Sequence, residues 1–124
     1  MDLKLKELEK LVNSELTSKI KKTTIIFNEL LVNTSAEELI NVIFFLKSHD
    51  KFKFRQLIDI AGVDYPEEEK RFSLVYLFLS HEQNTRIKVS LNFEIEKKIP
   101  TLTKIFPSAN WMEREVFDMF GIEF

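Results

Sequence analysis

The fold is decided by two neighbouring segments of the chain, FSLVYLFL at residues 72–79 and RIKVSLNF at residues 86–93. The first segment is apolar at nearly every position, which is typical of a central strand buried on both faces. The second segment alternates apolar and polar side chains, which is typical of a strand with one buried face. Residues 81–84 supply a turn between them. We therefore expect an antiparallel hairpin.

The residues before this hairpin predict two helices and further strands. Leucines at helical spacing predict an amphipathic helix over residues 2–16. The following Thr-, Ile- and Val-rich stretch predicts one or two strands, the firmer over residues 24–32. Ser35 is expected to cap a helix over residues 36–48.

A short strand over residues 56–63 and a last helix over residues 109–119 complete the expected elements. Ser108 is the candidate cap of this helix, and Gly121 is expected to end it. The order of elements predicts an α+β fold with helices packed on a mostly antiparallel sheet, in a single domain over residues 1–124.

The composition excludes several kinds of site. The chain has 44% apolar and 31% charged residues and a formal charge of −2, so we expect no nucleic-acid binding. It has no Cys, which excludes disulfides, thiolate metal sites and iron–sulfur ligation. No stretch approaches the ~20 apolar residues of a membrane span. We expect this chain to reach a membrane only through partners.

Residues that often carry chemistry are sparse. His49 and His81 stand at predicted loop ends, far short of the three or four ligands of a metal site. Gly62 and Gly121 are isolated, whereas phosphate-binding loops need several glycines so that the backbone can approach the phosphate. We therefore expect no metal, flavin or nucleotide bound to this chain.

Acidic residues would act in acid–base catalysis only if burial separated their pKa values, which no sequence shows. For each acid alone, a structural or solvated role is the expected one. The candidate acids are Asp59, Asp64, Glu113, Glu115 and Asp118, and a stand-alone enzyme would use Asp59, Asp64, Glu113 and Glu115.

Residues 109–121 (ANWMEREVFDMFG) form the most unusual segment. As a helix it is apolar on nearly all sides, and Arg114 faces Asp118 one turn later. We expect this helix at the end of the sheet, packed inward on one side and against another protein on the other. Trp111, Phe117 and Phe120 are the candidates for burial. A core helix with a local ion pair fits the same residues.

Two segments of this chain resemble a known family, the C subunits of bacterial NADH:quinone oxidoreductase, whose mitochondrial counterpart is the thirty-kilodalton subunit of complex I. Residues 106–121 are similar to the signature of this family: Glu-Arg-Glu, two residues, an acid and two apolar residues. Residues 56–66 are similar to a strand-and-turn segment of the family, and residues 71–76 and 86–89 to its next strands. The signature positions are filled here by Glu113, Arg114, Glu115, Asp118, Met119 and Phe120.

The resemblance covers residues 25–124. Family members usually continue beyond the position of Phe124 with a tail that wraps a neighbouring subunit. The sequence stops at Phe124, so we expect this chain to lack that tail. The resemblance also implies which residues belong to the signature or to a partner interface. They are Trp111, Glu113, Arg114, Glu115, Asp118, Phe120, Gly121, Asp59, Asp64, Tyr65 and Pro66.

The resemblance implies an accessory subunit of the hydrophilic arm of proton-pumping NADH:quinone oxidoreductase, without a catalytic, cofactor or metal residue of its own. Flavin and iron–sulfur clusters are expected in partner subunits. The expected neighbours are the forty-nine-kilodalton quinone-site subunit and the subunit bearing the terminal cluster. The expected place is peripheral, on the cytoplasmic side of the bacterial inner membrane or the matrix side of the mitochondrial one.

Three alternatives stay open. The equivalent subunit of a membrane-bound hydrogenase or a ferredoxin-linked complex would have a similar sequence. A stand-alone enzyme should bring its acids into one cleft, and the purified chain should turn over a substrate. The third alternative is an interaction module unrelated to respiration. A pull-down would distinguish it from the others by the partners that it binds.

Overall fold

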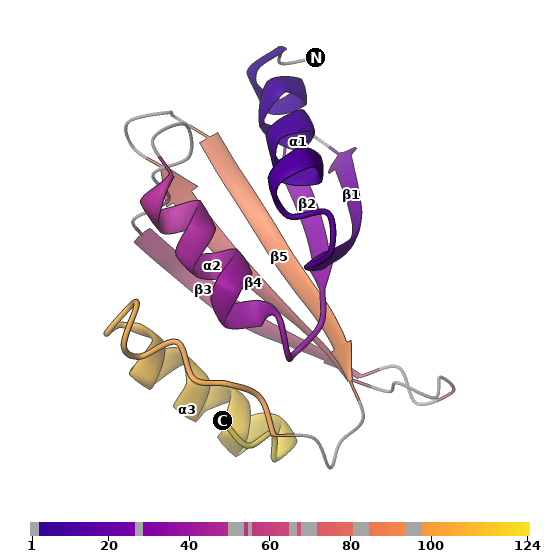
Figure 1. The fold of residues 1–124 in the computed structure, drawn as a ribbon. Helices are drawn as coiled ribbons and strands as arrows, with labels where there is room; N and C mark the ends of the chain where they lie inside the picture. Colours follow the sequence, from indigo (N-terminus) through magenta and orange to yellow (C-terminus); the bar gives the residue numbers. More distant parts are fainter. Residues whose placement is uncertain are drawn as a thin grey trace.

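A computed structural model of the chain shows three helices on a five-stranded sheet. It describes residues 3–26, 29–49, 54, 56–64, 67, 72–80, 85–93 and 98–124. The strands are ordered β1-β2-β5-β4-β3 across the sheet (Figure 1). In chain order the elements are α1 (Leu3–Glu15), β1 (Ile20–Ile26), β2 (Glu29–Thr34), α2 (Leu39–Ser48), β3 (Gln56–Asp64), β4 (Phe72–Ser80), β5 (Thr85–Phe93) and α3 (Ala109–Phe120).

The expected hairpin is confirmed as β4 and β5, which pair antiparallel from Phe72 opposite Phe93 to Ser80 opposite Thr85. All three helices lie on one side of the sheet (Figure 1), here called the inner face. On this face the side chains of β4 are buried, among them Tyr76. The opposite, outer face of β4 carries half-buried Leu77. The expectation of burial on both faces is therefore wrong for the outer face, because no described helix covers it.

The Thr- and Ile-rich stretch forms two strands where the firmer expectation placed one over residues 24–32. Strands β1 and β2 pair antiparallel, with Ile26 opposite Glu29. Strand β2 then runs parallel to β5, with Val32 opposite Val89. Since β3, β4 and β5 pair antiparallel, the sheet is mostly antiparallel, as expected.

Helices α1 and α2 are confirmed at nearly the expected bounds. Helix α2 begins later than expected, because residues 36–38 form a turn in which the Glu38 N–H donates to the Ser35 carbonyl (3.2 Å). The expected cap at Ser35 is therefore wrong. Glu38 stands at the N-cap and makes no side-chain capping bond.

Helix α3, which was expected at the end of the sheet, packs against β3, one of the two edge strands (Figure 1). The contact depends on Gly62 of β3: a Cβ atom placed there would lie 2.7 Å from Cε2 of Phe120. Glycine thus lets the helix approach the strand closely, and the Phe120 ring also meets the Phe72 ring edge-on, at 6.4 Å between centroids.

The α+β class is confirmed, with helices on a mostly antiparallel sheet around one core. Among the described helices, none is long and apolar enough to cross a membrane.

Candidate functional site

Helix α3 carries the segment that the sequence singled out, and its C-terminal end is built as expected. Gly121 adopts a left-handed conformation (φ 73°), and its N–H donates to the Phe117 carbonyl (2.8 Å). Glycine favours this conformation because it has no Cβ. Ser108 stands at the N-cap, as expected, but its side chain makes no capping bond.

The two sides of α3 differ sharply. The inner side buries Ala109, Glu113 and Val116, which recur at helical spacing. The outer side exposes Trp111 (66%) and Phe117 (49%). The expectation that these two aromatics are buried is therefore wrong. The expectation that the helix is apolar on nearly all sides is also wrong, because the side opposite Glu113 and Val116 carries Arg114, Glu115 and Asp118. Phe120, the third candidate for burial, is partly buried.

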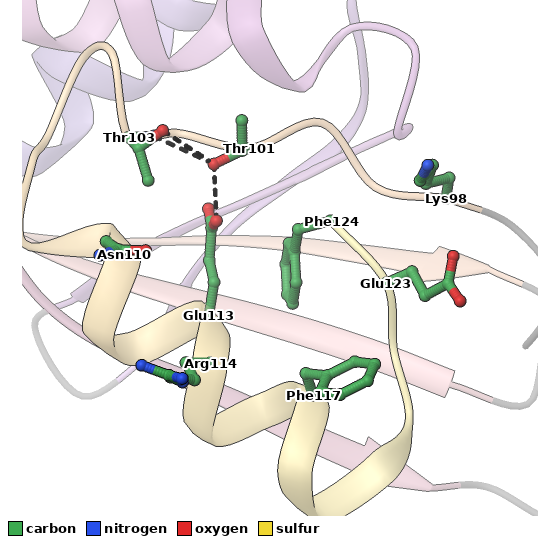
Figure 2. Close-up of a pocket in the computed structure, with 9 residues that line it drawn as sticks. All are labelled: Lys98, Thr101, Thr103, Asn110, Glu113, Arg114, Phe117, Glu123 and Phe124. Atoms are coloured by element: carbon green, nitrogen blue, oxygen red, sulfur yellow. Dashed lines mark hydrogen bonds between the residues drawn. The ribbon is translucent and has the colours of Figure 1, made fainter.

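Glu113 is the polar anchor of this helix. Only 5% of the residue is exposed. One carboxylate oxygen accepts the Leu102 backbone N–H (2.8 Å). The other accepts the Thr101 hydroxyl (2.6 Å), as Figure 2 shows. The signature carboxylate therefore joins α3 to the segment 98–108 that precedes it.

The same segment is held from α2 at its other end. Residues 102–106 form one helical turn, in which the Phe106 N–H donates to the Leu102 carbonyl (2.8 Å). Lys47 Nζ donates to the Ile105 carbonyl (2.6 Å) and lies 4.9 Å from the centre of the Phe106 ring. The Glu113 carboxylate lies at the N-terminal end of the turn and the Lys47 ammonium at its C-terminal end. Both charges interact favourably with the backbone dipole and so stabilise the turn.

Tyr76 lies on the inner face of β4, where the charge of Glu113 acts on its hydroxyl. Its hydroxyl is fully buried and has no hydrogen-bond partner among the described residues. Burial raises the pKa of the Tyr76 hydroxyl far above its usual value, and the negative charge of Glu113 raises it further. Tyr76 is therefore neutral at all physiological pH values.

An open pocket lies along α3, between the helix, the segment 98–103 and the last residues of the chain (Figure 2). The Ile99 N–H donates to the Glu123 carbonyl (2.9 Å), which ties those two segments together. Polar and aromatic side chains share the lining: Lys98, Thr101, Thr103, Asn110, Glu113, Arg114, Phe117, Glu123 and Phe124.

The signature residues separate into an inner and an outer group. Glu113 points inward, whereas Trp111, Arg114, Glu115 and Asp118 are exposed. No ion pair joins Arg114 to Asp118 within the described part of the chain, so the expected local pair is not formed.

The other acids lie away from the pocket. Asp59 is exposed on the outer face of β3, opposite outward-facing Leu77 of β4, whereas α3 packs on the inner face. Asp64 ends β3, while Tyr65, Pro66 and His81 lie outside the described residues. The structure therefore does not bring Asp59 and Glu113 into one cleft, which a stand-alone enzyme using these acids would need.

Sequence reasoning missed Thr101, Lys47 and Tyr76. Their roles depend on residues of other segments: Thr101 on Glu113, Lys47 on Ile105, and Tyr76 on the charge of Glu113. Among the residues that the structure describes, no group of three or more His, Cys, Asp or Glu side chains could hold a metal ion.

Comparisons with known proteins agree with the resemblance seen in the sequence. A family model described as the 30 kDa subunit of respiratory-chain NADH dehydrogenase matches residues 32–124. The C subunit of NADH-quinone oxidoreductase from Ruegeria pomeroyi is 48% identical over 98 residues, covering 79% of this chain and 49% of that protein. Its counterpart from Chelativorans sp. is 36% identical over all 124 residues, which cover 62% of its length.

A solved structure gives a third comparison. A chain of the membrane-bound sulfane sulfur reductase, an archaeal respiratory membrane complex, has a TM-score of 0.78 and 25% identity, covering 95% of this chain and 70% of that one. The chain spans about half to three-fifths of the length of the curated relatives named above. Since the family model covers most of the chain, the chain belongs to the family of 30 kDa subunits of respiratory-chain NADH dehydrogenase.

Proposed function

We propose that this chain is an accessory subunit of the hydrophilic arm of NADH:quinone oxidoreductase, without flavin, cluster or quinone site of its own. The holoenzyme would pass electrons from NADH to quinone and couple this transfer to proton pumping. The chain would support assembly and hold the electron path in register, packed beside the quinone-site subunit and near the subunit bearing the terminal cluster. It would be peripheral, on the cytoplasmic or matrix side of the membrane.

The main support for this proposal is the position of the signature residues on α3. Glu113 is buried and holds the helix in place through two hydrogen bonds, whereas Trp111, Arg114, Glu115 and Asp118 are exposed. Arg and aromatic residues are enriched at the centres of protein interfaces. Arg is also a poor proton shuttle, because it keeps its charge at all working pH values.

The test is the variant Arg114→Ala in the complete complex. We expect less assembled complex on native gels, with NADH:quinone activity per assembled complex nearly unchanged. Arg86→Ala is the control, because Arg86 is also exposed but belongs to β5. Normal assembly with activity reduced about a hundredfold would contradict the proposal, and would give Glu113, Arg114 and Glu115 a direct part in coupling; that effect corresponds to roughly 2.7 kcal/mol in the barrier.

The equivalent subunit of a related membrane-bound complex is the second candidate. The similarity in fold to a chain of the sulfane sulfur reductase complex favours it. The complex that co-purifies with the tagged chain should oxidise NADH under the first proposal. Oxidation of reduced ferredoxin, without NADH activity, would favour the second.

A further inference from the structure

The Glu113 carboxylate is buried without a compensating positive charge in the described part of the chain. Its hydrogen-bond donors, the Leu102 N–H and the Thr101 hydroxyl, are both neutral. No ion pair links it to a described Lys, Arg or His side chain. Lys47 donates to the Ile105 carbonyl, and the Arg114 side chain extends away from the carboxylate (Figure 2). Buried carboxylates are usually paired with a cation, because an uncompensated charge in a protein interior is costly.

The carboxylate can accept more hydrogen bonds than the described residues donate to it. An ionised carboxylate offers about four lone-pair sites, and the described contacts use one on each oxygen. Glu113 also lines the open pocket beside α3 (Figure 2). A group that enters this pocket from outside can therefore approach the carboxylate.

The rest of the pocket suits a planar, multidentate cation. Thr103 and Asn110 add a hydroxyl and an amide oxygen as acceptors to the lining. Phe117 and Phe124 add aromatic rings, on whose faces a guanidinium group can stack. Arginine carries five N–H donors in a rigid fork, whereas lysine presents a single point charge. The pocket lining carries two basic residues, Lys98 and Arg114, and two acidic residues, Glu113 and Glu123, so its formal charge is zero.

We propose that an arginine side chain of a neighbouring subunit enters the pocket between Phe117 and Phe124 and pairs with Glu113. This inference rests on the proposed function, since it names the chemistry by which the pocket beside α3 binds a partner. Glu113 then has two roles: it anchors the segment 98–103 inside the chain, and it supplies the anionic end of an intersubunit ion pair.

The first test uses the purified full chain with acetyl-argininamide as the probe. Acetyl-citrullinamide is the matched control, because citrulline has the shape of arginine without its charge. We expect saturable NMR shifts at the amides of Leu102 and Thr103 with the arginine probe, and at least tenfold weaker binding of the citrulline probe. Equal binding of the two probes, or no saturable shift, would overturn the inference.

Two variants test separately the negative charge of Glu113 and the hydrogen bond by which Thr101 anchors it. Glu113→Gln removes the charge but keeps an acceptor, and we expect it to lose arginine binding. Thr101→Ala removes one anchoring hydrogen bond but keeps the carboxylate, and we expect it to retain most of the binding. Thermal melts establish that both variants are folded. Loss of binding in Thr101→Ala as large as in Glu113→Gln would mean that the shape of the loop, and not the charge, makes the site, and would overturn the inference.

The second test uses the assembled complex. A photo-reactive benzoylphenylalanine at Phe117 should cross-link to a partner segment that contains an arginine. The same probe at exposed Phe44 of α2 is the control, and it should give a different cross-linked segment. A segment without arginine, or no cross-link from Phe117, contradicts the inference. Failure to co-purify with any oxidoreductase subunit would instead contradict the proposed function, so the two failures are distinguishable.

Discussion

Helices α2 and α3 lie on the same face of the sheet, but they are held there by different forces. Helix α2 buries four aliphatic side chains, Leu39, Val42, Ile43 and Leu46. Helix α3 buries only Ala109, Val116 and the carboxylate-bearing Glu113, and it leaves most of its aromatic surface exposed. The difference shows that apolar content does not decide which side of a helix is buried. The packing partner of each side decides it, and α3 exposes Trp111 and Phe117 together with the charged residues Arg114, Glu115 and Asp118, without a packing partner among the described residues.

The largest effect on stability should come from α2. Leu46 is fully buried in the core, so Leu46→Ala should lower the free energy of unfolding by about 2–5 kcal/mol, through lost burial and a new cavity. Phe44→Ala on the exposed side of the same helix should change it by no more than about 0.5 kcal/mol. Urea denaturation of the chain measures both. If the Phe44 variant is destabilised as strongly as the Leu46 variant, the exposed side of α2 contributes to stability as much as the buried side.

A smaller effect should come from the polar anchor of α3. Glu113→Ala leaves the buried Leu102 N–H without its acceptor, which should cost about 1–3 kcal/mol in free energy of unfolding. Glu115→Ala is the control on the same helix, because Glu115 is exposed and should be nearly neutral. Equal effects of the two substitutions, measured by urea denaturation, would show that the buried carboxylate does not hold α3 in place.

A smaller effect still is expected at Tyr76, whose buried hydroxyl has no described partner. Tyr76→Phe should change the free energy of unfolding by less than about 1 kcal/mol, with an increase expected, because no hydrogen bond is lost. The pKa of Tyr76 is raised in the folded chain by burial and by Glu113. Above pH ~10 the unfolded chain therefore loses this proton while the folded chain keeps it, so stability falls with rising pH.

That alkaline loss should be smaller in Tyr76→Phe than in the natural chain. The comparison needs urea denaturation of both chains at pH 7, 10 and 11. A substitution that costs several kcal/mol at pH 7 would mean that the hydroxyl has a hydrogen-bond partner after all.

The expectations that succeeded are those that depend on local patterns. The β4–β5 hairpin follows from two adjacent segments and the turn between them, and the left-handed Gly121 follows from one glycine after a helix. The parallel pairing of β2 with β5 joins Val32 to Val89, and such a distant pairing leaves no mark in a local pattern.

The side of α3 that faces the core illustrates why the rest could not be predicted. Periodicity identifies a buried side only when the other side is polar. In α3 the charged residues Arg114, Glu115 and Asp118 mark one side as exposed, but Trp111 lies among them and Glu113 lies among the buried residues, so residue type misplaces both. The inner side is held by the hydrogen bond that the Leu102 N–H donates to Glu113, and by Phe120, which occupies the space above Gly62. Both are contacts between residues distant in the chain or between different elements.

The smallest expected effect on stability is at Trp111, and it is also the sharpest test of the comparison between the two helices. Trp111 is 66% exposed, so Trp111→Ala should change the free energy of unfolding of the isolated chain by no more than about 0.5 kcal/mol. If the outer side of α3 binds a partner subunit, the same substitution should weaken that contact by about 2 kcal/mol or more, since buried tryptophans are frequent hot spots of interfaces. Urea denaturation of the chain and native-gel quantification of the complex measure the two effects separately. A stable chain with unimpaired assembly would show that this side of α3 faces solvent in the complex, and a strongly destabilised chain would show that Trp111 belongs to the core.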